Sequence, residues 1–532
     1  MSEEPTGTDA LRENLITRVT VGDALTRTAR RYPDRPAVVD GDRRWTWTDL
    51  EQRANRVGNA LLADGYRRGD RLALMAGNCA EFLVVHYSCA KIGVVLVPVN
   101  LGWRSGEIAY VLGHSAARGM VVAAGLLTAA AEPLEESPGA TDVIVFGDGP
   151  AGPVAGRDVR RLDELLASGA PEPPEVLVED RDPVQCRYTS GTTSKPKGVL
   201  GSHLACHVNS LTLAIEWRFT EHDRIACMMP MFHTGQLNLF CTPAVAVGAC
   251  MVILPGFDAG GLLDTIESES VTVLFGLPMM YRAVLQHPEV SEREVGSLRL
   301  AVYGMAPMPD EDLRRAIDVL GCDFSLMFGQ TEMGPVTTIF RPEHQLTHTG
   351  AVGTPTVNTE VAVMDTAGRL LGTGESGEIV YRGPQTMNGY LDDPDATATA
   401  FAHGWFHSGD VGHFDDDGVL WFDDRYKDVI KTGGENVASL EVERALYAAD
   451  ARVQEVAVVG LPHERWSEAI TAVVVPVAGA DLDPEELRTA LRDHLDGYKI
   501  PKAVLVLDEL PKTSTGKIQK NVLREKHAGY FA

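Results

Sequence analysis

The sequence has few basic residues for its length. Its 532 residues include 48 lysines and arginines against 74 aspartates and glutamates, which gives a formal net charge of -26 at pH 7. A field of this sign repels phosphate polymers and anionic lipid unless basic residues are gathered locally. We therefore expect no nucleic-acid partner.

The sequence also lacks any Cys-x-x-Cys pair. Most of its eight cysteines lie in apolar stretches, where free cysteine behaves as a small hydrophobic residue. The first residues, MSEEPT, are acidic and do not show the basic-then-apolar order of a signal peptide. These features predict reduced core cysteines and a cytoplasmic protein.

No apolar run is long and continuous enough to suggest a membrane span. The one long uncharged stretch, Thr234 to Phe257, is interrupted by Gln236, Asn238 and Gly248. We expect this stretch to be buried core. The sequence contains no internal repeat.

Short β-rich apolar runs alternate with longer amphipathic stretches through most of the chain. Leu72–Met75 precedes Glu81–Lys91, for example, and Leu298–Tyr303 precedes Glu311–Leu320. This alternation predicts βαβ units, and therefore an α/β domain in which helices pack on sheets. Hydrophobic residues make up 44% of the chain and charged residues 23%, as in ordinary globular proteins.

The pattern changes after about Asp423. A helix near Leu440–Ala448, strands at Val456–Gly460 and Ile470–Val477, and a helix at Pro484–Leu495 predict a small α+β unit. The short charged segment before it has no Pro or Gly and suits a hinge, in which a few dihedral angles reorient one domain. We predict three parts: a large N-terminal domain at 1–424, a hinge at 425–428 and a small mobile C-terminal domain at 429–532.

The densest chemical signal is a loop of hydroxyl, glycine and lysine residues, Tyr188–Val199 (YTSGTTSKPKGV). Its backbone N–H groups, hydroxyls and ammonium groups are donors that suit phosphate oxygens. No Gly-Lys-[Ser/Thr] sequence ends the loop, so it is not a Walker loop. A flexible turn explains the glycines but not the two lysines and the proline. The loop therefore predicts a phosphate site.

Three further clusters each end in a charged residue: Met327–Glu332 (MFGQTE), Trp405–Asp410 (WFHSGD) and Pro511–Lys517 (PKTSTGK). Singly, such a residue is most often solvated at a turn or caps a helix. Taken in order with the loop and with Arg425–Val437 (RYKDVIKTGGENV), they closely resemble the adenylate-forming (ANL) superfamily of acyl-CoA synthetases, luciferases and carrier-loading adenylation domains. The resemblance covers nearly the whole chain and is greatest to the acyl-CoA synthetase and fatty-acyl-CoA ligase type.

The resemblance implies a reaction in two halves. A carboxylate attacks the α-phosphate of ATP to give an acyl-adenylate and pyrophosphate, and the thiol of coenzyme A then displaces AMP. Donors must neutralise the charge that develops when two anions meet, which suits the lysine-rich loop. By the same resemblance Thr189 and Glu332 are expected to hold Mg²⁺, a hard cation that prefers oxygen ligands.

The resemblance also assigns roles to single residues. Asp410 is expected to bind both ribose hydroxyls, as a carboxylate can accept two hydrogen bonds, and Arg425 to support the sugar or the phosphates. Lys517 is expected to bridge the reacting carboxylate and the α-phosphate. His233 is expected to gate the acyl pocket rather than act as a base; without the resemblance, a core histidine would be the better interpretation.

The remaining assignments concern the nucleotide and coenzyme A. Lys427 falls at the hinge position, Lys431 beside the thiolation chemistry, and Gly433 and Gly434 where pantetheine passes. The expected binding residues are Thr189, Ser190, Gly191, Thr192, Thr193, Lys195, Lys197, Gly304, Met305, Ala306, Gly329, Gln330, Thr331, Asp410, Arg425, Lys427, Gly433 and Gly434. The histidine pairs 203/207, 344/348 and 403/407 lack a third ligand, so they do not support a histidine metal site.

The sequence departs from the family pattern at several positions. Ser194 replaces a usual glycine, and Met305 is bulky where many relatives have alanine or glycine, which suggests a narrowed and selective pocket. Ser439 and Ser467 replace a proline and a glycine on the side that faces coenzyme A. These changes leave the acceptor less certain than the adenylation.

Three alternatives therefore stay open. The first is a CoA ligase for a small-molecule carboxylic acid. The second is an adenylating enzyme that passes its acid, or a small oxyacid such as nitrite, to a carrier-protein thiol or an amine. The third is a pseudoenzyme that only binds nucleotide, against which Glu332, Asp410, Arg425 and Lys517 argue. A homodimer is compatible with the sequence.

Overall fold

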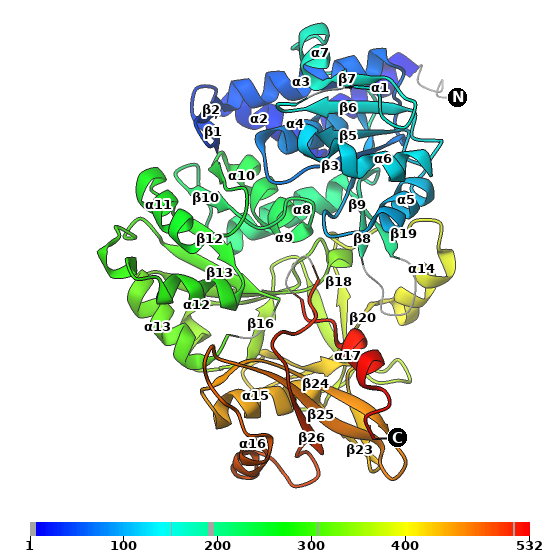
Figure 1. The fold of residues 1–532 in the computed structure, drawn as a ribbon. Coiled ribbons are helices and arrows are strands. Elements are labelled where there is room, and N and C mark those ends of the chain that lie inside the picture. Colours follow the sequence, from blue (N-terminus) through cyan, green and yellow to red (C-terminus); the bar gives the residue numbers. More distant parts are fainter. Residues whose placement is uncertain (1–6, 150–151, 190–195, 306–307, 514–516, 532) are drawn as a thin grey trace.

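Three β-sheets with helices packed around them organise the protein (Figure 1). The computed structural model describes residues 7–149, 152–189, 196–305, 308–513 and 517–531. Two large sheets are built before residue 426, and the chain from residue 430 onward builds a third, smaller sheet. The predicted α/β class is confirmed.

The first sheet has eight strands and is parallel from β8 to β7. Helices cover both of its faces: Leu72 and Leu74 point into the core that contains α3 and α4, whereas Ala73 and Met75 point toward α5 and α6. In sheet order the strands are β19 (Gly389–Tyr390), β9 (Lys197–Ser202), β8 (Pro183–Thr189), β4 (Val95–Pro98), β3 (Arg71–Met75), β5 (Gly119–Ala123), β6 (Asp142–Phe146) and β7 (Val159–Arg161). The helices of this part are α1 (Gly7–Thr17), α2 (Val21–Arg31), α3 (Trp47–Ala63), α4 (Ala80–Ile92), α5 (Ser105–His114), α6 (Leu127–Glu135) and α7 (Leu162–Ser168).

The second sheet has thirteen strands, with a parallel centre and antiparallel pairs toward both edges. Its order is β17 (Glu360–Met364), β18 (Gly377–Arg382), β20 (Phe406–Phe414), β21 (Leu420–Arg425), β16 (Ala351–Pro355), β15 (Thr338–Phe340), β14 (Asp323–Phe328), β13 (Leu300–Gly304), β12 (Val273–Gly276), β10 (Arg224–Cys227), β11 (Cys250–Ile253), β1 (Pro36–Asp40) and β2 (Arg43–Thr46). Its helices are α8 (His203–Glu216), α9 (Thr234–Gln236), α10 (Thr242–Val247), α11 (Ala259–Glu269), α12 (Pro278–Gln286), α13 (Asp310–Leu320) and α14 (Pro394–Ala400).

The uncharged stretch 234–257 is buried core for most of its length, as predicted, but Pro255 and Gly256 at its end are exposed. It forms α9, a π-helical turn at Leu237–Cys241, α10 and strand β11. Every residue of the π-helical turn is buried. All eight cysteines are free, and in the described part of the chain no helix is both long and apolar enough to cross a bilayer.

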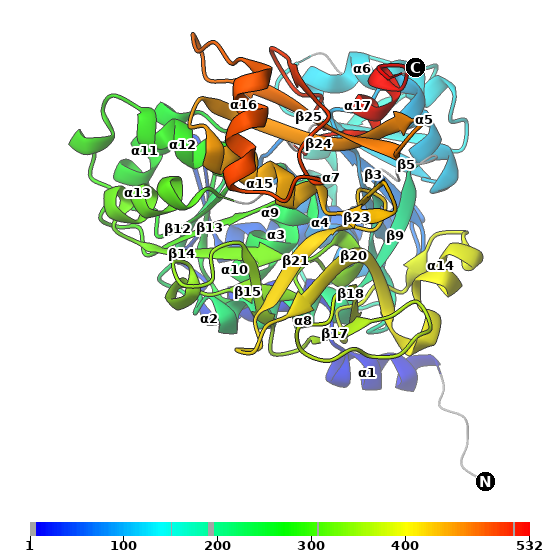
Figure 2. The same ribbon diagram turned by 90° about the horizontal axis from the view of Figure 1, so that it is seen from below.

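The third sheet contains β22 (Ile430–Thr432), β23 (Glu435–Val437), β24 (Val453–His463), β25 (Ser467–Pro476) and β26 (Ala503–Val506). Figures 1 and 2 show it at one end of the molecule, with α15 (Ser439–Ala449), α16 (Pro484–Ala490) and α17 (Lys520–His527) against it. The helix was predicted to extend to Leu495, but the α-helix ends at Ala490 and is followed by a single 3₁₀ turn at Leu491–Asp493.

The predicted hinge lies between β21 and β22. Asp428 N and Val429 N both donate to the carbonyl of Arg425, at 2.8 and 3.0 Å, so this segment forms one tight turn. Asp428 accepts a hydrogen bond from Arg524 Nη2 of α17 at 2.6 Å, and Asp424 accepts from the backbone N of Ser439. The domain boundaries and the hinge motion stay predictions.

Candidate active site

Strands β8 and β9 hold the two ends of the predicted phosphate loop. Thr189 pairs with Lys197 and Tyr188 with Gly198 in antiparallel register. Loop residues Ser190, Gly191, Thr192, Thr193 and Lys195 lie outside the described residues, as does Ser194. Helix α8 begins directly after β9 because Ser202 Oγ accepts from Ala205 N at 3.1 Å and caps the first turn.

Glu332 lies close to this hairpin through Tyr390 of β19. The Tyr390 hydroxyl donates to Glu332 Oε1 at 3.0 Å, and Lys197 Nζ lies 4.7 Å from the centre of the Tyr390 ring. Since Lys197 pairs with Thr189, these contacts bring the two predicted magnesium ligands to one region.

The turn that presents Glu332 requires a glycine. Gly329 has φ of +149°, and a Cβ on it would lie 2.2 Å from the carbonyl oxygen of Pro335. Only glycine fits so close to another backbone segment. The next residue, Gln330, has a buried Nε2 without a hydrogen-bond partner in the described part of the chain, so this amide is available to a ligand.

Burial raises the pKa of Glu332, and the Tyr390 hydrogen bond and the charge of Arg425 only partly offset it. No ion pair to Glu332 occurs among the described residues. A buried carboxylate of this kind fits a divalent cation, because a nearby positive charge would restore its ionised form.

Asp410 and Arg425 face each other across the neighbouring strands β20 and β21. They are direct partners in the antiparallel register, and Arg425 Nε lies 3.1 Å from Asp410 Oδ1. Asp410 is buried, and its Oδ1 accepts no hydrogen bond from the described residues, because the arginine contact lacks hydrogen-bond geometry. Burial raises the pKa of Asp410, and Arg425 and then Lys517 lower it. This carboxylate keeps acceptor capacity for a ligand.

Lys517, from the C-terminal part of the chain, acts electrostatically on the Asp410 carboxylate. Two hydrogen bonds with Thr513 hold its backbone: Thr513 N donates to Lys517 O at 2.8 Å, and Lys517 N donates to Thr513 Oγ1 at 3.1 Å. Although the residue is exposed, protein atoms crowd its ammonium group, and this desolvation, followed by the charge of Arg425, lowers the pKa of Lys517 to about 8. Asp410 acts in the opposite direction and favours the charged ammonium.

His233 is the N-cap of α9. Its Nδ1 accepts from Gly235 N at 3.1 Å, and a neutral ring with this acceptor carries its proton on Nε2. Burial lowers the pKa of His233 to about 4, and the charges of Arg187 and Lys517 act in the same direction. The imidazole is therefore neutral at physiological pH, and its low pKa makes it a weak base, which agrees with the expectation of a gate rather than a base.

Gly304 and Met305 follow the end of β13. A Cβ at Gly304 would lie 2.9 Å from Met327 Cε, the mobile end of a side chain, and 3.2 Å from the carbonyl oxygen of Met327 on the neighbouring strand β14. Met305 has φ of +67° and is 37% exposed. Ala306 lies outside the described residues.

The predicted thiolation residues lie apart from these groups. Lys431 is on β22, where its backbone N donates to Glu468 Oε2 at 2.6 Å, and Gly433 and Gly434 form the turn to β23 with φ of +62° and +92°. The exposed Lys427 lies beside Asp428 in the hinge turn. No hydrogen bond or ion pair of the described residues links Lys431 to Asp410, Glu332 or Lys517.

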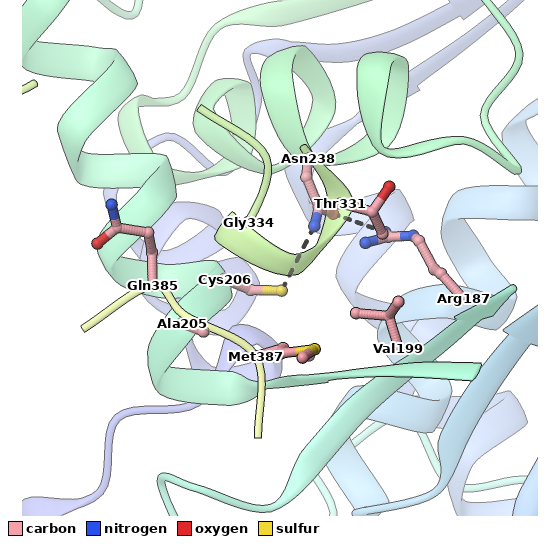
Figure 3. A pocket seen from close by; sticks show the side chains of 10 residues that line it. Arg187, Val199, Ala205, Cys206, Asn238, Thr331, Gly334, Gln385 and Met387 are labelled. Carbon is pink, nitrogen blue, oxygen red and sulfur yellow. Dashed lines mark hydrogen bonds between the residues drawn. The ribbon is translucent and has the colours of Figure 1, made fainter. Parts of the chain in front are cut away.

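A small cavity lies between β8, β9, α8 and the segment around Glu332 (Figure 3). Arg187, Asn238 and Thr331 supply its polar wall, and Val199 and Met387 supply apolar wall. Its volume is about 10 Å³. A space of this size holds about one water molecule.

Known proteins resemble the chain along nearly its whole length. The family model for AMP-binding enzymes matches residues 25–391, and the model for the AMP-binding enzyme C-terminal domain matches residues 441–517. The chain belongs to the AMP-binding enzyme family. The predicted recognition of an adenylate-forming enzyme is thereby confirmed.

Individual members of the AMP-binding enzyme family are similar throughout. A feruloyl-CoA synthase of Amycolatopsis sp. is 35% identical over 506 residues, covering 95% of this chain and 99% of that protein. A long-chain-fatty-acid–CoA ligase of Mycobacterium tuberculosis is 33% identical, covering 96% and 98%. The crystal structure of ATP-bound MatB from Rhodopseudomonas palustris has a TM-score of 0.88 at 30% identity, covering 97% of this chain and 100% of that one.

The structure of this AMP-binding enzyme places further residues near the predicted groups that the motifs did not indicate. Tyr390 contacts Glu332 from a two-residue strand whose pairing with β9 no local pattern reveals. Arg187 was visible as a cation in an apolar strand, but its burial and its contact with Asn238 depend on tertiary packing. Among the described residues, no three His, Cys, Asp or Glu side chains cluster as a metal site.

Proposed function

We propose that this protein is an AMP-forming acyl-CoA synthetase. It activates a small-molecule carboxylic acid with ATP, releases pyrophosphate and transfers the acyl group to the thiol of coenzyme A. The observation that carries this function is that Asp410, Arg425 and Lys517, residues from distant parts of the sequence, interact electrostatically, and that Asp410 and Arg425 also act on Glu332. The family and the CoA-ligase relatives support the same activity.

Asp410 and Arg425 are proposed to orient the nucleotide. The buried Oδ1 of Asp410 has acceptor capacity that the protein leaves unused, and a ribose offers two neighbouring hydroxyl donors. The Arg425 guanidinium lies 3.1 Å from the carboxylate and lowers the pKa of Asp410, which favours the charged form. Holding the sugar in this way places the α-phosphate for in-line attack.

Lys517 is proposed to bring the two reacting anions together. Its ammonium is a compact charge that can contact the acid and the α-phosphate at once, and it neutralises charge that develops during attack. His233 is proposed to close the acyl pocket as a neutral ring. Thr189 and Glu332 would hold Mg²⁺, which when bound would offset charge on the phosphate oxygens.

A pyrophosphate-release screen tests the proposed function. Purified enzyme is given ATP, Mg²⁺ and carboxylic acids of graded length and aromaticity, with and without coenzyme A, and thioester is measured in parallel. We expect pyrophosphate with at least one acid and thioester only with coenzyme A. Nitrite is included in the screen as an oxyacid. Product formed only as a carrier-protein thioester or as an amide would favour the alternative acceptors. Absence of pyrophosphate with every acid would contradict the proposal.

The dependence on pH should report Lys517. Because its ammonium is the active form and its pKa is about 8, kcat/KM for ATP should fall about tenfold per pH unit above that value. The Lys517→Arg variant, slower throughout, should lose this fall because a guanidinium stays charged. If kcat/KM of Lys517→Arg still falls above pH 8, the titrating group is not Lys517. We expect no separate inflection from His233 between pH 6 and 7.

Substitution of Glu332 should weaken magnesium-dependent activation. Glu332→Gln removes the ionised oxygen, so we expect kcat/KM to fall about 100-fold and the half-saturating Mg²⁺ concentration to rise. Tyr390→Phe, which removes only the hydrogen bond to Glu332, should cost about tenfold. The exposed Glu360→Gln serves as control, and an unchanged Mg²⁺ titration in Glu332→Gln would exclude Glu332 as a metal ligand.

Three further predictions belong to the proposal. A cytoplasmic location, a homodimer and a carrier-protein acceptor stay predictions.

A further inference from the structure

Arg187 is a buried cation without an anionic partner. It is 7% exposed, and among the described residues it forms no ion pair. Its Nη2 donates to Asn238 Oδ1 at 2.8 Å, while its Nε is buried and has no hydrogen-bond partner in the same part of the chain. Burial lowers the pKa of Arg187 to about 10, and the nearby thiols of Cys206 and Cys186 act in the opposite direction.

The guanidinium lies on the same side as the proposed chemistry. Residues two apart on a strand point to the same face of the sheet and lie about 7 Å from each other. Arg187 precedes Thr189 by two residues on β8, so the two side chains share a face. The charges of Arg187 and Lys517 both act on His233, so both cations lie within electrostatic range of the imidazole. Figure 3 shows Arg187 and Asn238 at the cavity wall near Thr331.

The protein does not need Arg187 to hold Asn238. Asn238 Oδ1 also accepts from Gln185 Nε2, and Asn238 Nδ2 donates to Gln185 Oε1, both at 3.3 Å. This amide pair would survive the loss of the arginine. An unpaired buried charge destabilises a protein by several kcal/mol relative to a paired one, so a ligand anion is the partner that the site lacks.

The cavity limits the size of that ligand. Its volume of about 10 Å³ has room for about one water molecule, and Val199 and Met387 form part of its wall. A long chain or a ring system has no space at this point. One oxygen of a carboxylate fits.

We propose that the acid substrate is a short diacid whose second carboxylate, remote from the reacting one, binds Arg187 at the inner end of the pocket. This inference rests on the proposed function and specifies its substrate class. Arg187 is a specificity-determining residue here: its Nε–H and free Nη–H groups donate to the second carboxylate in the planar geometry that a guanidinium offers. Asn238 fixes the orientation of the guanidinium.

Matched pairs of acids test the proposal. Pyrophosphate release is measured with butanoate against succinate and with pentanoate against glutarate, so that each pair differs only in the second carboxylate. We expect the wild type to prefer the diacid by about 100-fold or more in kcat/KM. Arg187→Met should lower the diacid value by about 100-fold and leave the monoacid value within about threefold.

Two variants separate recognition from folding. Arg187→Lys keeps a cation without the planar pair of donors, so it should retain only part of the preference. Arg18→Gln removes an arginine whose side chain is 5% exposed and is paired with Asp23, and it should leave the diacid-to-monoacid ratio unchanged. Thermal unfolding supplies a readout without turnover: succinate should raise the Tm of the wild type but not of Arg187→Met, whose unliganded Tm should equal or exceed that of the wild type.

The outcomes distinguish this inference from the proposed function. If monoacids or aromatic acids release pyrophosphate and form thioester as well as diacids do, and Arg187→Met changes all of them alike, the diacid inference is wrong and the proposed function stands. If no acid releases pyrophosphate, both fail. If Arg187→Met is insoluble, an unchanged diacid-to-monoacid ratio in Arg187→Lys overturns the inference.

Discussion

Lys517→Ala is expected to lower acyl-adenylate formation by about 100- to 1,000-fold, the usual effect of removing one charged group that stabilises a transition state. Its ammonium is the charge that the C-terminal part of the chain brings to the Asp410 and Arg425 pair. Thioester formation from supplied acyl-adenylate and coenzyme A should be largely spared, because that step no longer joins a carboxylate to a phosphate. Pyrophosphate release and thioester formation are measured separately.

A lysine on the same segment provides the control for this prediction. Lys512 pairs with Glu455 at 2.5 Å and lies on the other side of the Thr513 turn, so Lys512→Ala removes a charge of the same kind. We expect it to leave both half-reactions within about threefold, as is common for partly exposed ion pairs. Equal losses in the two half-reactions of Lys517→Ala would mean that Lys517 supports the fold rather than adenylation.

Gly434→Leu and Lys431→Ala should show the reverse pattern. The expected loss is about 100-fold in thioester formation from supplied acyl-adenylate, with pyrophosphate release changed by less than about threefold. Gly434 has φ of +92°, and no atom lies within 4 Å of a Cβ built on it, so a leucine there extends into open space that the proposed pantetheine path would use.

Backbone strain must be separated from blockage of that path. Gly479 has φ of +80° and equally open surroundings in a turn after β25, so Gly479→Leu carries the same strain elsewhere in the third sheet's region. Gly479→Leu should lower the free energy of unfolding as Gly434→Leu does, by about 1–2 kcal/mol, and Tm should fall accordingly. It should cause no selective loss of thioester formation. If the Lys517 and Gly434 variants fail identically in both assays, the proposed rotation between two half-reactions is wrong.

Local patterns in the sequence predicted individual elements well. The strand at Asp142–Phe146 has the predicted bounds, and the helix predicted at Glu81–Lys91 is α4, one residue longer at each end. These elements follow from hydrophobic periodicity, which depends on neighbours close in sequence. The order of strands in a thirteen-stranded sheet depends on pairings between residues far apart, and no local period encodes it.

The same difference separates the predicted site residues from those that were missed. Glu332, Asp410 and Lys517 stand in motifs with a fixed order, so a family resemblance could indicate them. Tyr390 and Asn238 reach the site through strand pairing and through a π-helical turn, and a tyrosine or an asparagine alone has no distinctive sequence context. Arg187 required knowledge of what surrounds it, because the functional signal is the missing partner.

The cross-strand pair of Asp410 and Arg425 has a consequence for the end of the catalytic cycle. Both residues belong to the second sheet and stay together if the C-terminal part moves, whereas Lys517 travels with that part. The departure of Lys517 would remove one positive charge from the surroundings of the AMP phosphate. Asp410, the carboxylate proposed to bind the ribose, would keep Arg425 as its partner. The enzyme would then loosen its hold on AMP at the phosphate end first, which links product release to the same movement that admits the thiol.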